Sequence, residues 1–91
     1  MIEELKKEET KYRKLYDEGI FLDGVKEDSF RIAIHKLQSK GIKETYRYFK
    51  SMRDKHSNSH SKLGRNLANA YNLVLGKLWK RYKKANQKHN I

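Results

Sequence analysis

Basic and aromatic side chains alternate in the stretch KETYRYFKSMRDKH, which runs from Lys43 to His56. Lysine and arginine contact phosphate oxygens, and aromatic rings stack on bases, so this combination is typical of a nucleic-acid-binding surface. The same alternation also fits an amphipathic helix whose rings face a hydrophobic core. The two interpretations differ in which side chains reach solvent.

On a helical projection, the apolar face of this stretch is expected to contact the core. That face consists of Ile42, Tyr46, Phe49, Met52 and His56, with Tyr48 at its border. The opposite side carries Lys43, Arg47 and Lys50. Because rings and cations then lie on different sides, we expect a basic ridge for phosphate contacts and not a stacking platform for single strands. A plain solvated face is the alternative for this ridge.

The last part of the chain predicts a larger basic face on a long helix. Its expected nucleic-acid contacts are Lys62, Arg65, Lys77, Lys80, Lys83, Lys84 and Lys88. A row of cations over several turns can follow a phosphate strand or lie across a groove. Trp79 flanks the apolar stripe of this helix, where it either closes the edge of the core or stacks on a base.

Residues for catalysis or metal binding are sparse. The chain has no cysteine, and His56 and His60 lack a nearby carboxylate that would complete a metal site. Beyond residue 28 the acidic residues are Glu44 and Asp54, so paired-carboxylate chemistry is not expected there. No glycine-rich phosphate loop is present. We therefore expect no enzyme, no cofactor and no metal.

The charge is strongly asymmetric. Residues 1–28 carry 6 basic and 9 acidic side chains, whereas residues 29–91 carry 16 basic and 2 acidic ones, which gives net charges of −3 and +14. Such a basic segment favours a polyanionic partner, and nucleic acid is the first choice, with DNA preferred over RNA because helices suit the major groove. An acidic protein partner and simple solubility remain alternatives.

The fold class expected is an all-α bundle of about four helices in a single domain, residues 1–91. The absence of proline and the apolar periodicity predict helices over about 2–18, 27–40, 42–56 and 63–87. The apolar segment GIFLDGV is expected to cross the core between two glycines, and HSNSHSK reads as a loop in which Ser59 or Ser61 caps the last helix.

The second and third helices, with the glycine turn SKGI between them, resemble a helix-turn-helix pair. Within the third, YRYFKS resembles the end of the recognition helix of tetracycline-repressor-type regulators, where a glycine turn leads to an aromatic pair and a lysine. The spacing from Gly41 to Tyr48 and Phe49 is shorter than in that family, and the chain has no room for its ligand-binding domain. No functional residues are carried over from it.

Some apolar residues are expected to face solvent. Ile32 and Leu73 point away from the apolar stripes of their helices, and with Trp79 they form a candidate protein interface. They support either a homodimer or a protein-interaction module, an inhibitor or adaptor that docks on an acidic host protein. No membrane span, secretion signal or small-molecule substrate is expected, so the chain is expected to be cytoplasmic. The expected function is that of a DNA-binding regulator or accessory factor, with a phage or plasmid as the candidate carrier.

Overall fold

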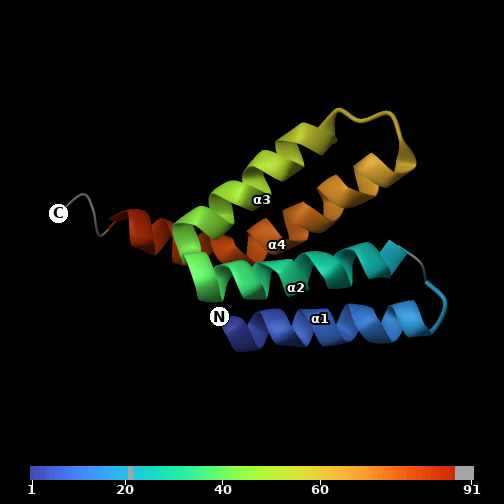
Figure 1. Cartoon of the computed structure of the whole chain (residues 1–91), viewed down its shortest axis with the longest axis horizontal. Coiled ribbons are helices and arrows are strands. Elements are labelled where there is room, and N and C mark those ends of the chain that lie inside the picture. The colour runs from blue at the N-terminus through green and yellow to red at the C-terminus, as the bar shows by residue number, and fades with distance from the viewer. Residues whose placement is uncertain (21, 88–91) are drawn as a thin grey trace.

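Four helices make up the described part of the chain. The computed structural model describes residues 1–20 and 22–87. The helices are α1 (Ile2–Asp17), α2 (Leu22–Lys40), α3 (Ile42–Ser57) and α4 (Lys62–Gln87). Consecutive helices pair into two hairpins, α1–α2 and α3–α4, and α2 joins the hairpins by packing on α3 and α4 (Figure 1). This arrangement confirms the expected all-α bundle of about four helices.

The core forms where the apolar stripes of the four helices meet. Its buried residues include Leu5, Tyr12, Phe30, Ala33, Ile34, Phe49, Tyr71, Val74, Leu75 and Leu78. Phe49 is fully buried, and its ring centroid lies 5.7 Å from that of Tyr71. Thr45 is also fully buried, and its hydroxyl donates a 2.7 Å hydrogen bond to the Gly41 carbonyl. The apolar face expected for residues 42–56 is therefore confirmed at its centre, with Thr45 as an additional buried member.

The start of α2 differs from the expectation. The helix begins at Leu22 and not near Glu27, so the residues from 22 to 25 of GIFLDGV form its first turn; Phe21 lies outside the described residues. Gly24 is inside the helix. A Cβ at this position would lie 3.0 Å from Cδ2 of the Tyr16 ring, so a larger residue would require that ring to shift by a few tenths of an ångström. Gly24 thus allows close packing of α1 on α2 and does not stop the helix.

Ion pairs hold α1 against α2. Glu9 accepts hydrogen bonds from Arg13 (3.2 Å) and Arg31 (3.1 Å), and Glu27 is bonded to the same two arginines. The hydrogen bond to Glu9 raises the pKa of Arg31 above its ordinary value, and Glu27 acts in the same direction. Two carboxylates of the acidic N-terminal segment, Glu9 and Glu27, are therefore paired with arginines within the α1–α2 hairpin.

The connection between α2 and α3 is a single residue, Gly41, with φ +85° and ψ 175°. Only glycine adopts this φ without strain, so it ends α2 and redirects the chain. A helix-turn-helix uses a turn of three or four residues. The shorter connection and the packing of α3 along α4 do not support the helix-turn-helix interpretation of this pair.

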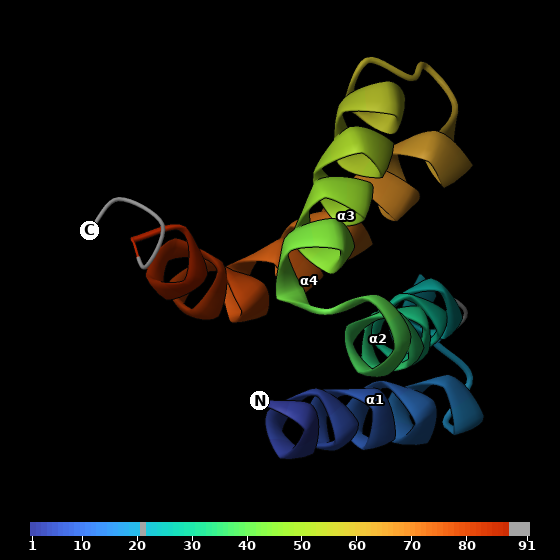
Figure 2. The same cartoon turned by 60° about the vertical axis from the view of Figure 1, so that its left-hand side comes forward.

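The fourth helix begins as expected after a serine cap, since the Gly64 amide donates a 3.0 Å hydrogen bond to Ser61 Oγ. Leu63, which was expected in its apolar stripe, is 61% exposed. It lies in the first turn of α4, at the end of the α3–α4 hairpin that points away from α1 and α2 (Figure 2). No close helix crossing occurs at Gly76, where a Cβ would meet no atom within 4 Å.

Candidate nucleic-acid interface

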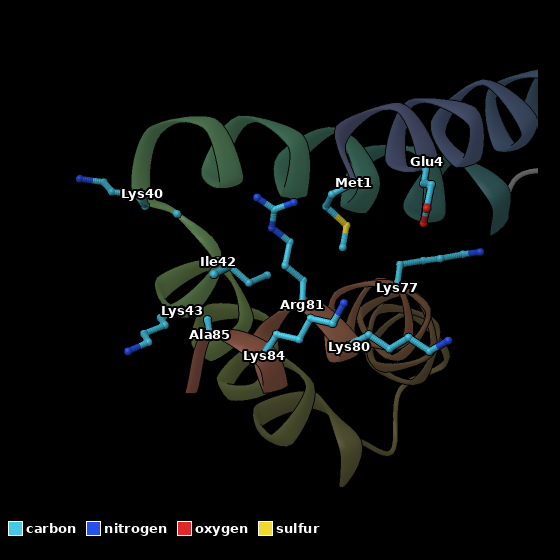
Figure 3. Close-up of a pocket in the computed structure, with 11 residues that line it drawn as sticks. Met1, Glu4, Lys40, Ile42, Lys43, Lys77, Lys80, Arg81, Lys84 and Ala85 are labelled. Carbon is cyan, nitrogen blue, oxygen red and sulfur yellow. The ribbon is translucent and has the colours of Figure 1, made fainter. Parts of the chain in front are cut away.

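A basic pocket opens where the turn between α2 and α3 meets the C-terminal half of α4 (Figure 3). Its volume is about 970 Å³. Six cationic side chains line it, namely Lys40, Lys43, Lys77, Lys80, Arg81 and Lys84. Among the described lining residues one, Glu4, is acidic, and Met1, Ile42 and Ala85 supply apolar surface. These six side chains are called the basic pocket below.

The fold explains why these cations converge. Lys40 and Lys43 flank Gly41, so the turn holds both at the same corner of the molecule. On α4, Lys77 and Arg81 are four residues apart, as are Lys80 and Lys84, so the two pairs form neighbouring rows along the helix. The N-terminus of α3 also lies at the pocket, and its partial positive charge adds to the field of the lysines.

Arg81 is exposed to solvent and is directed toward the apolar lining of the pocket. Its side chain points into the space between Ile42 and Met1 in Figure 3, and it also lines the smaller neighbouring cavity with Leu37. Most of the lysines reach outward in the same view, whereas the Lys84 side chain runs toward Arg81. A guanidinium offers two parallel N–H donors to a phosphate, whereas lysine ammonium groups act as point charges. The pocket thus combines one bidentate donor with five point charges.

The acidic helix α1 borders the pocket on one side. Glu8 forms a 3.5 Å ion pair with Lys77, and the carboxylate of Glu4 points toward the same lysine in Figure 3. These carboxylates lower the positive charge at this side of the pocket. A phosphate bound at Lys77 would have to replace Glu8 as the partner of the ammonium group.

No protein-family model matches the chain, and neither a curated protein nor a solved structure matches it significantly. The interface is therefore derived from the geometry of this chain alone.

The residues expected from the sequence divide into several groups. Lys43, Lys77, Lys80 and Lys84 line the basic pocket, and Lys83 is exposed beside it on α4. Lys62 and Arg65 are exposed at the other end of α4, with Lys62 about 27 Å along the helix axis from Lys80. Lys88 lies outside the described residues.

The ridge expected on α3 does not stay apart from the aromatic rings. The side chain of Arg47 hydrogen-bonds to Tyr82, whose ring stacks on Tyr46 at a centroid distance of 4.0 Å. The hydrogen bond with Asn86, followed by that with Arg47, lowers the pKa of Tyr82 below its ordinary value. Arg47 is exposed as expected for the ridge, but it also reaches an aromatic ring of the neighbouring helix α4.

Two basic-pocket residues, Lys40 and Arg81, were not among the expected contacts. On a helical projection Arg81 lies beside the apolar stripe of α4, so periodicity does not assign it to the basic face. Its spacing of four residues from Lys77 was the available signal. For Lys40 the signal was weaker, because its contribution depends on how the turn at Gly41 brings α2 to α4.

The expected protein-interface residues are all solvent-accessible. Ile32 and Leu73 are each 40% exposed, on α2 and α4 respectively, and Trp79 is 48% exposed. Trp79 also contacts Tyr46 and Tyr82. Within the described residues no group of three or more His, Cys, Asp or Glu side chains is placed to hold a metal ion, and no described helix has the length and apolarity that crossing a membrane requires.

Proposed function

We propose that this protein binds nucleic acid through phosphate contacts centred on the basic pocket. The observation that carries the proposal is the convergence of six cationic side chains from three helices around one open pocket, with Glu4 as the acidic member among the described lining residues. A phosphate chain crossing this surface would release condensed counterions at each contact, which supplies the affinity.

The geometry favours a polymer over a small enclosed anion. The pocket is open to solvent, its rows Lys77–Arg81 and Lys80–Lys84 follow α4, and Lys83 extends the charge around that helix. Successive phosphates of one strand can therefore meet successive cations. These contacts read the backbone and not the bases, which suits an accessory or regulatory factor whose binding depends weakly on sequence. Duplex DNA, the first choice from the sequence, and single strands both offer such a phosphate row.

The experiment is a binding titration over a salt series against duplex DNA, single-stranded DNA and RNA. Six phosphate contacts give a slope of log affinity against log salt of roughly −4 for a single strand and −5 for a duplex. Raising the salt from about 50 to 200 mM should then weaken binding roughly 300- to 2,000-fold. Absence of binding to all three polymers at the lower salt would refute the proposal.

Two double variants test whether the pocket is the centre of binding. Lys80→Gln with Lys84→Gln removes two charges from the pocket, and we expect the slope to fall by about 1.4–1.8. Lys62→Gln with Arg65→Gln removes the same charge from the exposed far end of α4 and should leave the slope unchanged. Equal effects of the two variants would mean that net charge, and not the pocket, determines binding.

The exposure of Ile32 and Leu73 favours a second candidate function, that of a protein-interaction module or of a homodimer. An acidic partner would be steered to the same basic surface. Capture of a stoichiometric protein partner from nuclease-treated lysate, together with no binding in the salt titration, would support this candidate over nucleic acid. Sedimentation of the purified chain would separate a dimer from a monomer.

A further inference from the structure

Three aromatic rings of α3 and α4 form a partly accessible cluster outside the lining of the basic pocket. The aromatic cluster consists of Tyr46, Trp79 and Tyr82. The Tyr46 and Tyr82 rings are stacked, with an interplanar angle of 10°, and the Trp79 ring lies 5.9 Å from Tyr46 and 6.4 Å from Tyr82 between centroids. Trp79 is nonetheless 48% exposed. The indole is thus supported by two rings while nearly half of its surface contacts solvent.

Support from two rings makes Trp79 suitable for stacking. A side chain already held by neighbours loses little conformational entropy when a ligand binds to it. Tyr46 and Tyr82 belong to different helices, so the packing of α3 on α4 fixes the indole from two sides. An isolated surface tryptophan would lack this preorganisation.

Cations surround the aromatic cluster. Arg47 hydrogen-bonds to Tyr82, and Lys50 is near enough to act electrostatically on the same phenol. Lys83 follows Trp79 by four residues and therefore lies on the same side of α4. The row of Lys80 and Lys84 comes next around the helix and belongs to the basic pocket. Positive charge thus continues from the pocket around α4 to the indole.

We propose that Trp79, held by Tyr46 and Tyr82, is a stacking site for an unpaired base of a single-stranded nucleic acid whose phosphates lie on the basic pocket. This inference rests on the proposed function and restricts the nucleic acid to single strands. A paired base is covered by its neighbours on both faces, so inside a duplex it has no free face for the indole. An unpaired base has one, and stacking on an aromatic side chain tolerates any base.

The surrounding charge argues for this ligand over a protein partner. Tryptophan acts as a protein hot spot when surrounding contacts exclude water from it. Here Arg47 and Lys50 act on Tyr82 of the same cluster, and Lys83 lies one helical turn from Trp79. Each of these cations would need a partner if it were buried in an interface. A strand carries a phosphate beside every base, which matches the pairing of an aromatic ring with adjacent cations.

The test compares two strands of about ten nucleotides, a length within the range that one small domain contacts. One is oligothymidylate, and the other is an abasic strand with the same sugars and phosphates. Trp79 is the one tryptophan of the chain, so its fluorescence reports directly on the site. We expect oligothymidylate to bind about 5- to 150-fold more tightly and to quench the indole, while the abasic strand does not quench it.

Variants of Trp79 test whether its ring causes the preference for oligothymidylate over the abasic strand. Trp79→Ala should lower the affinity for oligothymidylate to that for the abasic strand, measured by anisotropy of a labelled strand, and should change abasic binding less than twofold. Trp79→Phe retains a ring and should keep a several-fold preference, which provides a readout if the alanine variant loses helical circular dichroism. Leu73→Ala, a change at another exposed apolar residue of α4, should alter neither affinity.

The possible failures are distinguishable. Equal affinity for the two strands without quenching, or tighter binding to a duplex of the same length, overturns the stacking site and leaves phosphate binding by the basic pocket in place. A well-folded Trp79→Phe variant without any preference for oligothymidylate overturns it as well. Binding of neither strand at low salt overturns both this inference and the proposed function.

Discussion

Replacing Phe49 by alanine tests whether the rings of α3 face the core or a ligand. The Phe49 side chain has 0% exposure, and its ring centroid lies 5.2 Å from Tyr48 and 5.7 Å from Tyr71, which belongs to α4. Truncation of a buried phenylalanine leaves a cavity and removes its dispersion contacts, which costs about 3–5 kcal/mol. We expect Phe49→Ala to lower the free energy of unfolding by this amount.

This loss is large relative to the whole molecule. At about 0.05–0.15 kcal/mol per residue, a chain of this length has a free energy of unfolding of roughly 5–14 kcal/mol. The substitution should therefore remove at least a fifth of the stability and could remove nearly all of it. Since each kcal/mol shifts the Tm of a small domain by about 4–8 °C, the Tm should fall by roughly 12–40 °C.

Urea denaturation followed by far-ultraviolet circular dichroism measures the change. The matched control is Lys50→Ala, which alters the next residue, an exposed one, and should change the free energy of unfolding by less than about 0.5 kcal/mol. A loss below about 1 kcal/mol for Phe49→Ala would refute the packing of this ring between α3 and α4. The interpretation of residues 43–56 as a ligand-facing helix would then return.

Three smaller predictions concern a turn, a cap and a titration. Gly41→Ala should lower the free energy of unfolding by about 1–2 kcal/mol, because its φ of +85° strains any other residue. Gly76→Ala, at an open helical position, should raise it by about 0.5–1 kcal/mol. Thermal unfolding measures both changes. Ser61→Ala should cost about 1 kcal/mol in the same measurement, since it removes the hydrogen-bond acceptor for the α4 amide three residues on. In an NMR pH titration, Tyr82 should ionise below its ordinary pKa, and Arg47→Met should raise that pKa. Because folding favours the phenolate, this contact stabilises the fold at high pH and the contribution disappears as the pH falls below the Tyr82 pKa.

The sequence predicts the helices well where apolar residues recur at helical spacing. Phe30, Ala33 and Ile34 are buried as their spacing indicates, and Ile32 is exposed. The predicted start of α2 was wrong because GIFLDGV, bounded by two glycines, was expected to cross the core outside the helix. The role of Gly24 depends on the Tyr16 ring, a contact between helices that no local pattern contains.

The candidate site is harder to predict from the sequence than the helices are. Lys77, Lys80 and Lys84 follow from periodicity on α4, but periodicity also includes Lys62 at the far end of the same face. Which cations act together depends on where the turn at Gly41 brings α2 and α3. Arg47 shows the same dependence, because its contact with a ring comes from α4 and not from its own helix.

The peripheral position of α1 has a consequence for the dynamics of the molecule. This helix packs chiefly on α2, while α2, α3 and α4 contact one another. Elements held by one neighbour open more readily in the native state than elements held by several, and hydrogen exchange detects such local unfolding. We expect the amides of α1 to exchange before those of α4. Each opening would carry Glu4 and Glu8 away from Lys77, so the charge of the basic pocket would fluctuate with the local stability of a helix that lies mostly outside it.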